Sequence, residues 1–151
     1  MEGFFSKKTA FVGIMAIVLA LFYVGSRPFL DNQRNAGDTV SRTARIGENE
    51  YMLEVADTDA LRQKGLGGRA SLCEKCGMLF VFDQPNRYAF WMEGMRFPLD
   101  IIWLFGDMVV FIARDVQPDF SGSIRPPVSA DRVIEVNAGQ AVYLNVEDRI
   151  Q

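Results

Sequence analysis

Cys73 and Cys76 are the residues of this chain whose type and spacing most directly suggest chemistry. They lie in the stretch SLCEKCGMLFVF, residues 71–82, and they are the 2 cysteines of a sequence without histidine. Redox dithiols need a stabilised thiolate, which they commonly obtain at a helix N-terminus, whereas here a strand-like apolar run follows. A structural zinc ion takes four ligands, and two cysteines supply only half of them. We therefore expect a structural disulfide, worth about 2 kcal/mol for so short a loop, with a thiol-disulfide oxidoreductase as the alternative.

A second group of candidate residues lies beside or inside apolar runs. It comprises Arg62, Arg69, Trp91 and Asp100. An arginine can bind an anionic group, and a tryptophan can form the apolar wall of a pocket. We predict a ligand site where the segment that contains both arginines meets residues 90–100. The alternative is structural: a buried Asp100 would be paired with an arginine or hydrogen-bonded to a loop, because an unpaired buried carboxylate is costly.

Carboxyl groups at Glu54, Asp100 and Glu135 also lie beside or inside apolar runs. Two carboxylates that face one cleft can catalyse glycoside hydrolysis. The lack of histidine removes the commonest general base and metal ligand from the sequence. We therefore predict no catalytic residue, no metal site and no cofactor, and we keep a hydrolase with paired carboxylates as an alternative.

The N-terminal segment predicts passage into or through a membrane. Residues 9–25 carry no charge, and as a helix they would span roughly 25 Å, near the short limit for a bilayer core. Lys7 and Lys8 precede this run, which places residues 1–8 in the cytoplasm by the positive-inside rule. A good cleavage site is missing near Gly25, so an uncleaved anchor is favoured over a cleaved signal peptide.

Four parts of the chain follow from this interpretation. They are a cytoplasmic N-terminus (1–8), a transmembrane anchor or signal segment (9–25), a polar linker (26–40) and an extracytoplasmic domain (41–151). The net charge of −3 argues against a nucleic-acid partner. We expect a single-pass membrane protein, or a secreted one after cleavage. Its domain would be a binding or envelope-associated module, with the lipid bilayer and an unknown ligand or envelope protein as partners.

Short apolar runs separated by turn residues dominate the domain and are typical of β-structure. We predict strands at 42–46, 50–56, 78–82, 88–92, 99–105, 108–116, 133–136 and 141–144. A short helix is expected to begin at Asp57 or Thr58 and to end at Gly65. The run LDIIWLF (99–105) is apolar on both faces, which indicates a central strand. Because long crossover helices are missing, we predict an antiparallel sandwich or a partly closed barrel with one short helix.

Four segments resemble the domain-of-unknown-function family numbered 192. They are VADTDALRQKGLGGR (55–69), GMLFVF (77–82), FWMEGMRFPLDIIW (90–103) and VIEVNAGQA (133–141). A tryptophan–methionine pair followed by Pro-Leu-Asp makes the resemblance specific. It implies a compact, mainly β domain that is often exported or membrane-tethered, and it carries no activity over. Matching positions are Arg62, Gly65, Leu66, Arg69, Gly77 to Phe80, Phe82, Phe90, Trp91, Met92, Pro98, Leu99, Asp100, Glu135 and Gly139.

The sequence departs from the family pattern at three places. Gly67 and Gly68 stand where the family has a methionine and a bulky residue, and residues 147–148 replace a Gly-Asp turn. Residues 93–95 replace a polar Lys-Asn-Thr stretch. A ligand contact made by that stretch would therefore not transfer to this chain.

Overall fold

The computed structural model describes residues 39–151. The predicted cytoplasmic N-terminus, the anchor and nearly all of the linker lie outside these residues. Within residues 39–151 no helix has the length and apolar character that a bilayer crossing requires.

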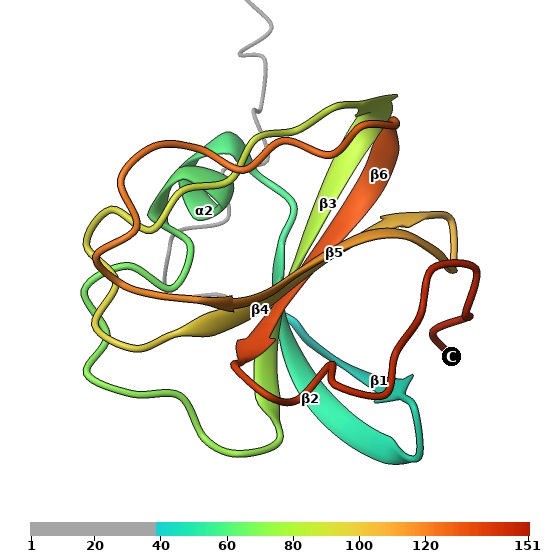
Figure 1. Cartoon of the computed structure of the whole chain (residues 1–151), viewed down its shortest axis with the longest axis horizontal. Coiled ribbons are helices and arrows are strands. Elements are labelled where there is room, and N and C mark those ends of the chain that lie inside the picture. The colour runs from blue at the N-terminus through green and yellow to red at the C-terminus, as the bar shows by residue number, and fades with distance from the viewer. Residues whose placement is uncertain (1–38) are drawn as a thin grey trace, which may run out of the picture. The chain divides into compact units, whose positions relative to one another are not determined.

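Among residues 39–151, six strands form a single mixed sheet with open edges, and one short helix packs on it (Figure 1). The strand order is β1-β2-β3-β6-β4-β5. All neighbouring pairs are antiparallel except β2 and β3, which run parallel. The elements are β1 (Ser41–Ile46), β2 (Asn49–Ala56), α2 (Asp59–Lys64), β3 (Cys76–Asn86), β4 (Leu99–Phe105), β5 (Met108–Val116) and β6 (Ala130–Asn137).

The prediction of a mainly β domain with one short helix is confirmed, but its finer form is wrong in two respects. The strands make one sheet rather than a sandwich or barrel, and the sheet is not wholly antiparallel. The physical reason lies in residues 57–75, where α2 and a loop carry the chain back so that β3 starts at the same end as β2. A helix of only 6 residues suffices for this crossover because the loop supplies the remaining length.

Two predicted strands are absent from the sheet because their apolar side chains pack onto it. Residues 88–92 form only one β-bridge, between Phe90 and Ile124. Residues 141–144 form a turn. Phe90 is buried in the core on one side of the sheet, and Leu144 is buried in the core on the other side. Apolar content predicted the burial of Phe90 and Leu144, but Trp91 and Tyr143 are exposed, and the apolar content could not distinguish a strand from a covering loop.

The strand β4 is central and covered on both faces, as its sequence predicts. Leu99, Ile101 and Trp103 enter the core that α2 covers, which we name the helix-side core. Ile102 and Leu104 enter the opposite core, which the C-terminal residues cover. Because successive side chains of a strand point to opposite faces, one apolar run serves both cores. Figure 1 shows α2 on one side of the sheet and the red C-terminal segment on the other.

Local sequence signals set both ends of α2. The Thr58 side chain accepts a hydrogen bond from the Leu61 backbone N–H at 3.3 Å and caps the first turn. Gly65 ends the helix with a φ of 49°, a conformation that favours glycine. Leu61 and Leu66 face the sheet and are buried. The helix therefore packs on the sheet through Leu61, and its other side chains are partly or fully exposed.

Gly77 allows three strands to approach closely. An added Cβ at this position of β3 would lie 2.6 Å from the Glu135 carbonyl oxygen and 2.6 Å from Leu53 Cδ2. A side chain would therefore push β3 away from β2 or β6, and glycine is required here for packing.

Candidate functional site

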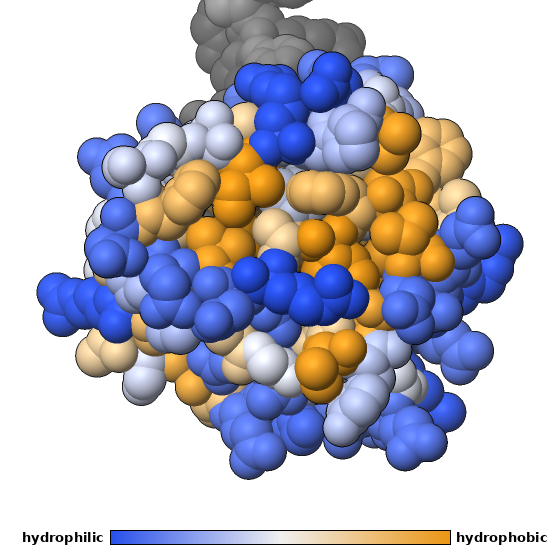
Figure 2. All heavy atoms as spheres, viewed as in Figure 1, coloured by the Kyte–Doolittle hydropathy of each residue, from blue (hydrophilic) through white to orange (hydrophobic). Residues whose placement is uncertain are grey.

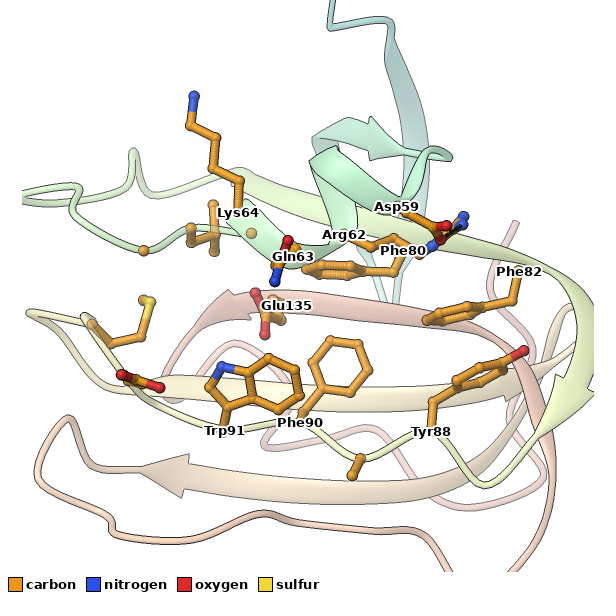
Figure 3. A pocket seen from close by; sticks show the side chains of 16 residues that line it. Asp59, Arg62, Gln63, Lys64, Phe80, Phe82, Tyr88, Phe90, Trp91 and Glu135 are labelled. Atoms are coloured by element: carbon orange, nitrogen blue, oxygen red, sulfur yellow. Dashed lines mark hydrogen bonds and ion pairs between the residues drawn. The ribbon is translucent and has the colours of Figure 1, made fainter. Parts of the chain in front are cut away.

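A pocket opens on the helix-side face between α2 and residues 88–95. Its volume is about 480 Å³, within the range of small-molecule sites. Figure 3 shows α2 on one side of the pocket, Trp91 and Phe90 on the other, and Glu135 between them. The lining residues are Asp59, Arg62, Gln63, Lys64, Gly65, Leu66, Gly67, Phe80, Phe82, Tyr88, Ala89, Phe90, Trp91, Glu93, Met95 and Glu135.

Glu135 supplies a buried carboxyl group at the base of the pocket. The alternation of β6 places it on the helix-side face together with Val133, between Met78 of β3 and Ile101 of β4. Only 5% of its surface is exposed. No group within residues 39–151 donates a hydrogen bond to this carboxyl, and burial raises its pKa from 4.5 to about 8. Glu135 is thus mainly protonated at neutral pH.

Aromatic rings form the walls around this carboxyl. Phe80 and Phe90 meet edge to face with their ring centroids 4.9 Å apart. Phe82 and Tyr88 stack at 3.5 Å and close one end of the pocket. Trp91 is 51% exposed although it lines the site. Such rings offer a ligand large apolar surfaces that are already fixed in place.

Arg62 lines the pocket, but its guanidinium group mainly holds α2 to β3. It donates hydrogen bonds to the backbone oxygens of Asp57 at 2.9 Å and Val81 at 2.7 Å, and it pairs with Asp59. Its Cζ lies 5.3 Å from the centroid of the Phe82 ring. Figure 3 shows the guanidinium beside Asp59 rather than at the centre of the pocket. The Arg62 guanidinium is thus held by three groups of the protein itself, and this favours a structural role for Arg62 over a role in ligand binding.

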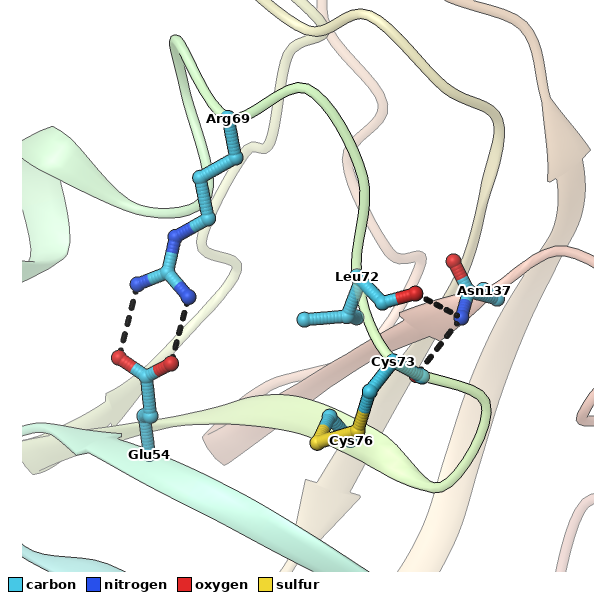
Figure 4. The surroundings of a disulfide bond; sticks show 6 residues. All are labelled: Glu54, Arg69, Leu72, Cys73, Cys76 and Asn137. Carbon is cyan, nitrogen blue, oxygen red and sulfur yellow. Dashed lines mark hydrogen bonds and ion pairs between the residues drawn. A yellow bond between two sulfur atoms is a disulfide. The ribbon is translucent and has the colours of Figure 1, made fainter.

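Arg69 does not line the pocket. It forms a two-pronged ion pair with Glu54 of β2, with one N–O distance of 2.7 Å (Figure 4). The hydrogen bond from Arg69 lowers the pKa of Glu54, and the same bond raises the pKa of Arg69. Both side chains are about one third exposed. The pair ties the loop after α2 to the sheet.

Asp100 is buried on the opposite face of the sheet and also lies outside the pocket. Its Oδ1 accepts a hydrogen bond from the Asp115 backbone N–H, and its Oδ2 accepts one from the Ala141 backbone N–H, both at 2.8 Å. These bonds satisfy the carboxylate, and they hold the irregular stretch of β5 at Asp115, where φ is 50°, and the turn after β6. The arrangement matches the structural alternative for Asp100, in which the buried carboxylate is hydrogen-bonded to the backbone of a loop.

Cys73 and Cys76 are joined as a disulfide at the start of β3. The Asn137 side-chain amide donates hydrogen bonds to the carbonyl oxygens of Leu72 and Cys73, at 3.3 and 3.0 Å (Figure 4). The loop is thereby attached to the end of β6. In residues 39–151 no three cysteine or acidic side chains gather closely enough to hold a metal ion.

Of the four predicted ligand-site residues, the structure brings Arg62 and Trp91 together at one pocket. Arg69 and Asp100 lie elsewhere, each held by its own protein partners. Sequence reasoning did not assign Glu135 to the ligand site. The available signal was a glutamate inside the apolar run VIEVN, on a strand that is covered on both faces.

The surface of this domain combines apolar and charged areas. Figure 2 shows apolar side chains at the centre of one face, surrounded and crossed by hydrophilic ones. Large apolar residues with at least 50% exposure include Met52, Trp91, Phe105 and Tyr143. Trp91 is the one of these four that lines the pocket.

Comparisons with known proteins place the domain in a family and a fold. The sequence profile of DUF192, described as an uncharacterized ACR, matches residues 41–151. A crystal structure of a candidate transcription regulator from Sinorhizobium meliloti 1021 is similar, with a TM-score of 0.70 and 23% identity. The similarity covers 75% of this chain and 94% of that chain.

A second similar crystal structure is that of a protein of unknown function from Novosphingobium aromaticivorans DSM 12444. Its TM-score is 0.66 at 29% identity, over 75% of this chain and 84% of that chain. The search of curated proteins gave no match.

Proposed function

We propose that this chain, which belongs to the DUF192 family, is a binding module of the cell envelope whose ligand site is the pocket beneath α2. The observation that carries the proposal is the Glu135 carboxyl, which is buried among aromatic rings and has no protein partner within the described residues. Buried polar groups normally have partners, so an orphan carboxyl that faces a pocket indicates a missing ligand group.

The pocket has the composition of a small-molecule site. Five of its lining residues are aromatic, and the charged or amide side chains of six others supply the polar groups that can orient a ligand. The exposure of Trp91 at the rim costs free energy in the free protein, and a bound apolar body would recover it. The neighbour described as a candidate transcription regulator gives no reason to propose DNA binding, because its likeness at 23% identity concerns the fold.

The envelope location rests on the sequence. Residues 9–25 are uncharged and follow Lys7 and Lys8, which favours an anchor with the domain outside the cytoplasm. A disulfide between Cys73 and Cys76 fits an oxidising compartment.

Ligand binding is tested with 2-phenylethanol, a small neutral aromatic probe, by saturation-transfer NMR on the full-length chain in mild detergent. We expect a signal that disappears in Trp91→Ala. The matched control is Tyr143→Ala, which removes a ring that is 90% exposed and does not line the pocket. Equal signals from both variants, at unchanged melting temperatures, would contradict the placement of the site.

The location is tested by fractionation of the full-length chain from a Gram-negative host. We expect the protein to stay with membranes after alkaline carbonate washing, and its domain to be digested by protease added to spheroplasts. Recovery of intact, full-length chain in the soluble cytosol would refute the anchor.

A hydrolase is the second candidate, and one observation favours it. Glu135 keeps its proton near neutral pH, as a general acid must, and Glu93 lines the same pocket. Release of nitrophenol from nitrophenyl glycosides that is lost in Glu135→Gln would support this candidate. Activity that persists in Glu135→Gln would exclude Glu135 as the acid.

The thiol-disulfide oxidoreductase alternative has no comparable support. Cys76 is the first residue of a strand, and α2, the one helix among residues 39–151, ends at Lys64. The feature that usually stabilises a redox thiolate is therefore not provided by the described residues. Insulin reduction at the rate of the buffer alone would match this interpretation.

A further inference from the structure

We propose that the pocket binds a protonated primary amine on an apolar body, with the ammonium group on the Glu135 carboxylate and the body against the aromatic walls. This inference rests on the proposed binding function and names its ligand class.

Among the described residues the Glu135 carboxyl lacks a hydrogen-bond partner, and a charged donor is the partner that would stabilise its ionised form. Glu135 is 5% exposed, and Figure 3 shows its carboxyl directed into the space between Gln63 and Trp91. Its neighbours across the sheet, Met78 and Ile101, are apolar and cannot donate. A ligand ammonium group supplies three donors and the opposite charge, and such charge-assisted hydrogen bonds are among the strong ones for a buried carboxylate.

The walls also favour a cation. Rings attract a positive charge at their faces, and the site already contains one example, with the Arg62 guanidinium over Phe82. Phe80, Phe90 and Trp91 surround the Glu135 carboxyl in the same pocket. An ammonium group held at Glu135 would therefore lie among further aromatic rings. The apolar body of the same ligand would fill the rest of the pocket, whose volume is about 480 Å³.

The other charged groups around the pocket do not oppose this ligand. On α2, Arg62 is paired with Asp59, and Figure 3 shows the Lys64 side chain directed away from Glu135. Glu93, from the segment opposite α2, adds a negative charge to the lining.

The remaining titratable groups near Glu135 are Tyr88 in the lining and, on β2, Glu54. Glu54 lies in the same cross-strand row, one strand beyond Met78, and is paired with Arg69. Met78 separates it from Glu135. Glu135 is therefore the group near the pocket centre whose protonation changes when a cation binds.

Binding is coupled to one proton. In the empty pocket Glu135 is protonated below pH 8, and the ion pair with an ammonium group requires the carboxylate, so the Glu135 proton leaves to solvent. The ligand keeps its own proton, and no other bond changes. With a pKa of about 8, the apparent affinity should rise about 50-fold from pH 6 to pH 8 and level off above it.

The experiment compares 2-phenylethylammonium with the neutral 2-phenylethanol, by calorimetry on the full-length chain at several pH values. We expect the ammonium affinity to rise with pH as stated and the alcohol affinity to stay constant. Two buffers with different ionisation enthalpies should report close to one proton released per ammonium bound at pH 6. A lysine derivative blocked at both backbone ends represents an amine on a polypeptide side chain, and 2-phenylethylammonium represents a free amine. Tighter binding of either probe supports the amine site and indicates which source the pocket prefers.

The variant Glu135→Gln should remove the pH dependence and lower the ammonium affinity to that of the alcohol. The surface variant Glu48→Gln should keep both. If the two probes bind equally at every pH, the amine inference fails while the binding function stands. If neither probe binds, both fail.

Discussion

Replacing Glu135 by glutamine should stabilise the protein, and the gain should grow with pH. Burial raises the pKa of this carboxyl to about 8 in the folded state, whereas the unfolded chain has its ordinary value of 4.5. Between these values the unfolded state loses the proton that the folded state retains. The free energy of unfolding of the wild type therefore falls as pH rises from 4.5 to 8 and is constant again above 8.

The magnitude follows from the proton linkage. One bound proton changes the free energy of unfolding by about 1.4 kcal/mol per pH unit. From pH 5 to pH 8, the advantage of Glu135→Gln over the wild type should grow by about 3 to 4 kcal/mol. Glutamine has nearly the same shape and never ionises, so the comparison isolates the titration of one carboxyl.

Urea unfolding of the full-length chain in a non-ionic detergent measures this difference. Trp103 is fully buried whereas Trp91 is half exposed, so the change in tryptophan fluorescence on unfolding mainly reports the loss of the helix-side core around Trp103. The control is Glu48→Gln in the exposed β1–β2 turn, for which we expect a constant difference from the wild type. If the advantage of Glu135→Gln also stays constant within 1 kcal/mol between pH 5 and pH 8, the carboxyl is not buried and uncharged as argued.

Three further substitutions test the packing and the ion pairs. Gly77→Ala should lower the free energy of unfolding by about 2 to 3 kcal/mol, because its Cβ meets two neighbouring strands, and an unchanged urea midpoint would contradict that close approach. Asp100→Asn should lower the free energy of unfolding by about 2 to 3 kcal/mol, because an amide can accept only one of the two backbone hydrogen bonds. A crystal structure of the variant with both hydrogen bonds intact would contradict this reasoning. Arg69→Lys should lower the free energy of unfolding by about 1 kcal/mol, since lysine cannot make both contacts with the partly exposed Glu54. This decrease in stability should become smaller in high salt, as urea unfolding at two salt concentrations would show.

The sequence predicted the elements whose signals are local. The sequence placed the start of α2 at Asp57 or Thr58 and its end at Gly65, and the doubly apolar run of β4 identified a central strand. These signals are read from neighbouring residues, so they do not depend on distant contacts. The parallel pairing of β2 with β3 was not predicted, because it depends on how residues 57–75 cross the sheet.

The site divides in the same way. Composition alone showed that Cys73 and Cys76 are the two cysteines of the chain, and the sequence grouped Arg62, Arg69, Trp91 and Asp100 as candidate ligand-site residues. Only the tertiary structure decided which polar residues find protein partners. Asp100 and Glu135 are both acids inside apolar strands, yet one meets two backbone N–H groups and the other faces an aromatic pocket without any within residues 39–151. That difference depends on the face of the sheet and on the loops that cover it, which are contacts between residues far apart in the chain.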